Sequence, residues 1–93
     1  MRRSFVKSIW KIDWKESAVK DLKKLEKRTQ KIILKFIEEK IRVNPERRAI
    51  NLKGNLLGLK RYRVGDYRII CQMKDDVMEI LIIAIGHRRE IYG

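Results

Sequence analysis

The spacing of hydrophobic residues changes along this chain, and each change predicts a different element. Residues 8–14 alternate, with Trp10, Ile12 and Trp14 on one side and the polar residues Lys11 and Asp13 on the other. A period of two is typical of a half-buried strand. We therefore expect a strand over 8–14 whose aromatic side faces a core.

From Glu16 onward the period lengthens to that of amphipathic helices. Apolar residues recur three or four positions apart, at Ala18, Leu22, Leu25, Ile33, Phe36, Ile37 and Ile41. The stretch 26–30 interrupts this stripe, which predicts two helices, over 16–26 and 29–43, packed as a hairpin. One long bent helix fits the same pattern, because nothing in 26–30 forces a break.

Capping and stop signals refine the ends of these helices. Asp13 or Ser17 is a candidate N-cap of the first helix and Thr29 of the second, since their side-chain oxygens accept from free backbone N–H groups. Asn44-Pro45 is expected to end the second helix, because proline disfavours helical geometry in the residue before it.

The second half of the chain predicts a loop and three strands. Residues 44–58 form the loop, and strands follow over 59–64, 67–73 and 77–85, with turns at Gly65-Asp66 and 74–76. The run 77–85 is almost wholly apolar, which favours a central strand buried on both faces. The order β-α-α-β-β-β predicts one α+β domain over 1–93, with a helical hairpin on one face of an antiparallel sheet.

Charge narrows the range of partners. Twenty-four Lys and Arg against 12 Asp and Glu give a net charge of +12, which favours nucleic acid, an anionic membrane or an acidic protein, although basic surfaces also serve solubility. No run of apolar residues is long enough to cross a bilayer, and the first residues lack the apolar stretch of a signal peptide. The single Cys71 favours a reducing compartment and a buried, inert thiol. One His and one Cys offer no metal-ligand spacing.

The segment LKRYRVGDYRII, residues 59–70, concentrates these cations within two predicted strands. If Gly65-Asp66 is a two-residue turn, Arg63 pairs with Arg68, so that Arg61, Arg63 and Arg68 converge on one sheet face and Lys60 points away from it. Asp66 is the only acid between Leu52 and Met73. This face is either an ordinary solvated surface or a site for phosphate.

The closing segment IGHRREIY, residues 85–92, holds the only histidine together with two arginines and a tyrosine. It follows the buried strand, so we expect it to border the arginine-bearing face. His87 is a candidate proton carrier near neutral pH, and Tyr92 a candidate base-stacking residue. A surface histidine without function and a tyrosine that anchors the terminus are equally consistent with the sequence.

Together these segments resemble the RelE/ParE superfamily of toxins from toxin–antitoxin systems, in particular its RelE-like branch. The resemblance extends over nearly the whole chain, and YRVGDYR and HRREIY are its specific part. It implies a small twisted antiparallel sheet with a helical hairpin on one side. It also implies an endoribonuclease, or mRNA interferase, that cuts mRNA in the ribosomal A site by metal-independent attack of a ribose 2′-hydroxyl on the scissile phosphate, without a cofactor.

The resemblance also assigns roles to individual residues. It implies catalytic roles for Arg61, Arg68, Arg88, Tyr92 and His87, and RNA-binding roles for Lys53, Lys60, Arg63 and Arg89. Arginine suits a phosphate in the transition state because it is planar and permanently charged, but it does not easily act as a base. His87 is therefore a candidate general base, and the alternative is catalysis by positioning and electrostatics alone.

The implied partners are a cognate antitoxin that lays an acidic segment on the basic face in a heteromeric complex, the ribosome and mRNA. The implied location is the cytoplasm, with no role for a membrane. Two other functions fit the same fold. One is ParE-like inhibition of DNA gyrase, and the other is a non-catalytic RNA-binding relative of these toxins.

Overall fold

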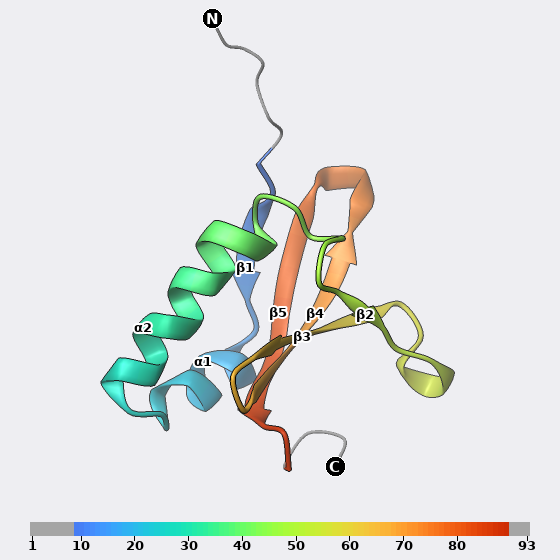
Figure 1. Cartoon of the computed structure of the whole chain (residues 1–93). Coiled ribbons are helices and arrows are strands. Elements are labelled where there is room, and N and C mark those ends of the chain that lie inside the picture. Colours follow the sequence, from blue (N-terminus) through green and yellow to red (C-terminus); the bar gives the residue numbers. More distant parts are fainter. Residues whose placement is uncertain (1–8, 90–93) are drawn as a thin grey trace, which may run out of the picture.

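A computed structural model describes residues 9–89 and confirms the α+β class, with two helices against one five-stranded sheet (Figure 1). The strands are β1 (Lys11–Trp14), β2 (Ile50–Asn51), β3 (Leu59–Val64), β4 (Tyr67–Lys74) and β5 (Glu79–His87). Their order in the sheet is β1-β5-β4-β3-β2, so the apolar strand β5 is central, as its composition predicts.

The sheet is mixed, and the expectation of a purely antiparallel sheet is corrected at one edge. Strands β2 to β5 pair antiparallel, but β1 runs parallel to β5, with Ile12 opposite Ile80 and Trp14 opposite Ile82. The helical segment between β1 and the other strands acts as a crossover that returns the chain in the same direction. Strand β1 is shorter than predicted, and its exposed and half-buried residues alternate as expected.

The two helices are separate, which excludes the single bent helix. Helix α1 spans Glu16–Lys23 and α2 spans Lys27–Phe36, continued by the π-helical turn η1, Ile37–Ile41. The predicted N-caps are wrong. Lys15 and Glu26 occupy those positions, and α2 begins two residues before Thr29 because the backbone oxygen of Glu26 already accepts the N–H of Gln30.

The second helix also ends earlier than predicted, at Ile41 rather than near Asn44. Pro45 instead lies buried beside the sheet, where its backbone oxygen accepts a hydrogen bond of 2.5 Å from the Tyr62 hydroxyl. The region predicted as loop holds the short edge strand β2 and the 3-10 turn η2, Gly54–Leu56. The turn before β5 is the 3-10 turn η3, Asp75–Val77.

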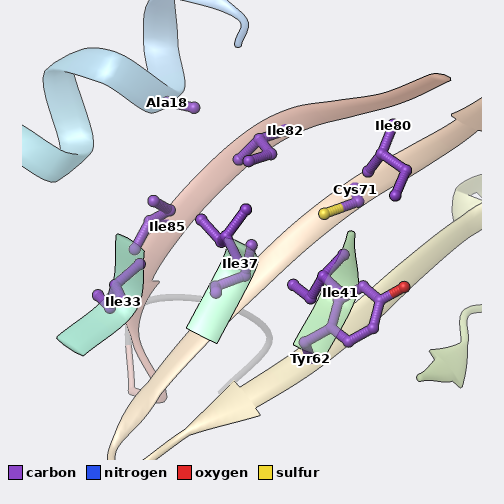
Figure 2. Close-up of a cluster of buried hydrophobic side chains, with 10 residues drawn as sticks. Ala18, Ile33, Ile37, Ile41, Tyr62, Cys71, Ile80, Ile82 and Ile85 are labelled. Carbon is purple, nitrogen blue, oxygen red and sulfur yellow. The ribbon is translucent and has the colours of Figure 1, made fainter. Parts of the chain in front are cut away.

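The core lies between the helices and one face of the sheet. Figure 2 shows Ala18 of α1 and Ile33, Ile37 and Ile41 of the second helical segment directed toward the strands. The facing strand residues are Tyr62, Ile69, Cys71, Ile80, Ile82 and Ile85. Both helices pack on this face. The residues of β3 and β4 that alternate with these core residues therefore point to the other face of the sheet.

Strand β5 contains a β-bulge that changes which of its residues face the core. Ile70 pairs with Ala84, but the next residue of β4, Cys71, pairs with Ile82, which leaves Ile83 without a cross-strand partner. Before the bulge the even-numbered residues Ile80 and Ile82 face the helices, whereas after it Ile85 does.

Side chains of α1 hold the bulge in place. The Ser17 hydroxyl donates to the backbone oxygen of Ile83 over 2.9 Å, and the backbone N–H of Ile85 donates to the Asp21 carboxylate over 3.0 Å. The backbone N–H of Lys15 donates to Ile82 at the point where β1 ends. Thus side chains of α1 hydrogen-bond to backbone groups of β5 in the part of the strand that β1 does not pair with.

We predict that Ile37→Ala lowers the free energy of unfolding by about 2–5 kcal/mol, because it leaves a cavity in the core. Ile32→Ala is the matched control: Ile32 lies in α2, which η1 continues, but it is 53% exposed, and the expected change is within about 0.5 kcal/mol. Urea unfolding followed by circular dichroism measures both. Equal effects of the two substitutions would contradict this description of the core.

Candidate phosphate-binding site

The predicted register between β3 and β4 is confirmed. Gly65-Asp66 forms the turn, Val64 pairs with Tyr67 and Arg63 pairs with Arg68. Gly65 has a φ of +59°, a conformation that glycine adopts at little cost. Because paired residues point to the same side, Arg61, Arg63 and Arg68 share the sheet face away from the helices, and we call this the arginine face.

Arg88 lies close to the same cluster. It follows β5, and its backbone N–H donates to the backbone oxygen of Asp66 over 2.8 Å, which ties the segment after β5 to the β3–β4 turn. Its charge acts on Arg68 strongly enough to lower the pKa of that residue. Gly86, the cross-strand partner of Arg68, adds no side chain to this face.

Arg68 is the most constrained group on the arginine face. Its pKa is lowered from the ordinary value, first by burial and then by the positive charges of Arg63, Arg61 and Arg88, while Asp66 acts in the opposite direction. One guanidinium nitrogen, Nη1, is buried and has no hydrogen-bond partner among residues 9–89. A buried donor without an acceptor, surrounded by like charges, is the arrangement that an anion stabilises.

Lys60 lies on the opposite face, as its place in the alternation predicts. Its Nζ donates to the Asn51 side-chain oxygen over 2.6 Å and forms an ion pair of 3.2 Å with Glu46. These contacts at the β2 edge separate the lysine from Arg61, Arg63 and Arg68.

His87 does not border the arginine face, and that expectation is wrong. The bulge at Ile83 places it on the helix face, paired with Tyr67, and the two rings meet edge to face with centroids 5.6 Å apart. Its Nδ1 accepts the backbone N–H of Arg89 over 3.2 Å.

The remaining predicted residues are more dispersed. Arg89 is exposed beyond the end of β5, and Lys53 is exposed at the start of η2 in the loop before β3. Tyr92 lies outside the described residues.

Other chemistries find little support in the part of the chain that the structure describes. Cys71 is buried, and burial raises the pKa of its thiol to about 12, so it is protonated near neutral pH and is a poor nucleophile. Residues 9–89 contain no group of three side chains suited to hold a metal ion. Among them no helix is long and apolar enough to cross a membrane.

Sequence reasoning missed two contributors to this site. The backbone oxygen of Asp66 anchors Arg88, and Gly86 leaves room opposite Arg68. Gly86 is visible in the sequence directly before His87, but the sheet face on which it lies depends on the bulge. The Asp66 contact comes from the backbone, which carries no side-chain signature.

A small, strongly basic α+β domain with a cationic sheet face is the class of protein that this geometry defines. Comparison with known proteins identifies the family. Residues 12–92 match the family described as the ParE toxin of the type II toxin–antitoxin system parDE. The toxin RelE of Mycobacterium tuberculosis (strain ATCC 25618 / H37Rv) is 30% identical over 76 residues, or 82% of this chain and 78% of that toxin.

Solved structures agree with this family. The RelBE2 toxin–antitoxin complex of M. tuberculosis contains a chain with a TM-score of 0.82 and 25% identity, covering 86% of this chain and 92% of that one. The archaeal RelE–RelB complex of Pyrococcus horikoshii OT3 gives a TM-score of 0.72 and 27% identity, covering 87% and 97%. The chain belongs to the RelE/ParE superfamily of type II toxin–antitoxin toxins.

We predict that Arg63→Gln stabilises the fold at low ionic strength, because Arg63 and Arg68 are like charges placed directly opposite each other. The melting temperature should rise by about 1–4 °C and the gain should shrink as salt screens the cluster. Arg47→Gln, which removes an equal charge from the exposed turn before β2, is the control and should show no such gain. A lower melting temperature for Arg63→Gln at low salt would show that the arginines do not repel one another.

Proposed function

We propose that this toxin is a ribosome-dependent endoribonuclease that cuts mRNA in the A site. The observation that carries the proposal is Nη1 of Arg68, which is buried and has no hydrogen-bond partner among residues 9–89. Arg61, Arg63 and Arg88 add positive charge around it. A phosphodiester supplies the acceptor oxygens and the negative charge that this group lacks. The similarity to RelE toxins over most of the chain supports the same function.

The proposed reaction needs no metal. The 2′-oxygen of a ribose bonds to the adjacent phosphorus, the bond from phosphorus to the 5′-oxygen of the next nucleotide breaks, and the products are a 2′,3′-cyclic phosphate and a 5′-hydroxyl. The proton of the 2′-hydroxyl passes to water, and the leaving 5′-oxygen takes one up. Arg61, Arg68 and Arg88 stabilise the extra negative charge on the phosphoryl oxygens as it develops. Arg63 holds a neighbouring phosphate.

The general base of this reaction is not assigned to a side chain on the arginine face. Lys60 is engaged with Glu46 and Asn51 on the other side of the sheet, and His87 faces the helices. Arginine remains protonated even when neighbouring charges lower its pKa. Catalysis in this proposal rests on alignment of the 2′-oxygen and on electrostatic stabilisation. Tyr92 is proposed to stack on a base.

The partners and the cellular location follow from this function. The ribosome positions the mRNA, with Lys53 and Arg89 as further cationic contacts, and the site of action is the cytoplasm. An antitoxin is proposed to inhibit the toxin by laying an acidic segment across the arginine face, where it would satisfy the same donors as RNA. The two similar structures from Mycobacterium tuberculosis and Pyrococcus horikoshii are toxin–antitoxin complexes, which supports such a partner.

A second candidate function is inhibition of DNA gyrase. The family that matches residues 12–92 is named for ParE toxins, and this name favours the gyrase function. The buried Nη1 of Arg68 among like charges favours RNA cleavage, because a phosphodiester supplies the acceptor and the negative charge that this cluster lacks.

We predict that the wild-type protein stops cell-free translation and leaves mRNA cut within codons, and that Arg68→Ala lowers the cleavage rate by about 100-fold or more. Arg28→Ala removes the same charge from α2 and is expected to cut at the wild-type rate. Cleavage is read by primer extension on ribosome-bound mRNA.

A parallel DNA supercoiling assay with purified gyrase tests the alternative function: loss of supercoiling with intact mRNA would overturn the RNase proposal. RNA binding without any cut product would favour the non-catalytic relative.

A further inference from the structure

A polar hollow of about 490 Å³ lies between α1 and the adjoining ends of β4 and β5. It opens on the helix side of the sheet. Asp21 of α1, Lys24 and Leu25 directly after α1, Tyr67 of β4 and residues 85–87 of β5 line it. The phosphate-binding role proposed above uses none of these side chains. The volume is that of a site for a small organic ligand.

The walls of the hollow combine aromatic and apolar surface. Tyr67 and His87 meet with ring centroids 5.6 Å apart at an interplanar angle of 80°, so the two rings present differently oriented faces. Both residues are half-buried and keep part of their surface accessible, while Ile85 is 4% exposed. A planar heterocycle fits such a site, because unstacked nucleobases bind to tyrosine and histidine rings.

The polar groups of the hollow match the edge of a base. The Asp21 carboxylate is held in place by the backbone N–H of Ile85 over 3.0 Å and is an acceptor. Lys24, the residue directly after α1, is an exposed donor. His87 Nδ1 accepts the backbone N–H of Arg89 over 3.2 Å, and this contact holds the ring at the wall of the hollow. Donors and acceptors together are what a Watson–Crick edge requires.

A free anion and an apolar ligand fit less well. An inorganic phosphate would meet the Asp21 carboxylate as well as Lys24, and an apolar molecule would bury both charges without compensation.

The hollow adjoins the arginine face through consecutive residues. Tyr67 lines the hollow and Arg68 follows it on the opposite face, and in the same way His87 follows Gly86, the cross-strand partner of Arg68. The Cα atoms of consecutive residues are about 3.8 Å apart. The hollow and the arginine face therefore lie at the same end of the sheet on opposite sides, and an RNA strand would pass around this end to use both.

We propose that this hollow binds one unstacked nucleobase of the RNA, next to the nucleotide whose phosphate contacts Arg68, and so selects the sequence that is cut. In naming RNA, this inference rests on the proposed function. It gives His87 the role of a base-recognition residue in place of a general base.

The first experiment is an NMR titration of the whole protein with each of the four nucleoside 5′-monophosphates. We expect chemical-shift changes at the Leu25 and Ile85 methyl groups and at the His87 ring, with at least one base preferred. Tyr67→Ala, checked for folding by circular dichroism, should weaken this binding by about tenfold, the loss expected for one base stack. Arg68→Ala should leave the shifts in the hollow in place. Shifts confined to the arginine face would overturn the inference.

The second experiment compares cleavage across codons for wild type, His87→Ala and His87→Gln. A role in base recognition predicts that the preferred codons lose rate while the others keep it, so the pattern flattens. A uniform loss at every codon would mean that His87 acts on the reaction itself and would overturn the inference. If the wild-type protein cuts no mRNA, the proposed function fails, and the nucleotide titration still decides whether the hollow binds a base.

Discussion

The β-bulge in β5 is the constraint on which the rest of the structure depends. Strand β5 is central, so its side-chain phase determines what both faces of the sheet present. Without the unpaired residue Ile83, the even-numbered residues would face the core along the whole strand, and the phase after it would be reversed. The bulge therefore directs Ile85 and His87 toward the helices and leaves Gly86 opposite Arg68. Helix α1 helps to fix this phase, because the Ser17 hydroxyl donates to the backbone oxygen of Ile83 and the Asp21 carboxylate accepts the backbone N–H of Ile85.

The division of charge between the two faces has a physical cost. Arg61, Arg63 and Arg68 lie together with one nearby carboxylate, Asp66, whose influence on Arg68 is smaller than that of the surrounding cations. Among residues 9–89 the ion pairs found are Arg42–Glu38 and Lys60–Glu46, and neither involves the arginine face. The core on the other side, built largely from isoleucine, offsets this repulsion. The core and the proposed anion-binding surface thus lie on opposite faces of the same strands.

The sequence predicted what short-range rules determine. The two-residue turn at Gly65-Asp66 fixes the register of β3 and β4, and the period of two then places Arg63 with Arg68 and turns Lys60 away. It did not predict the parallel pairing of β1 with β5, because these strands are far apart along the chain. Nor did it predict the bulge, since the run from Ile80 to Ile85 is apolar in both phases. The face of His87 depends on that phase, so its position could not be read from spacing.

The parallel pairing of β1 and β5 also determines when the sheet can assemble during synthesis. Among the described strands β1 pairs only with β5, and β5 lies inside the sheet between β1 and β4. Such contacts between distant segments form late, because the whole intervening chain must be made before the two strands meet. A nascent chain that ends before β5 cannot form the β1–β5 pairing or the β4–β5 pairing, and it lacks Arg88. The order of translation therefore keeps the cationic face incomplete until β5 and Arg88 have been made.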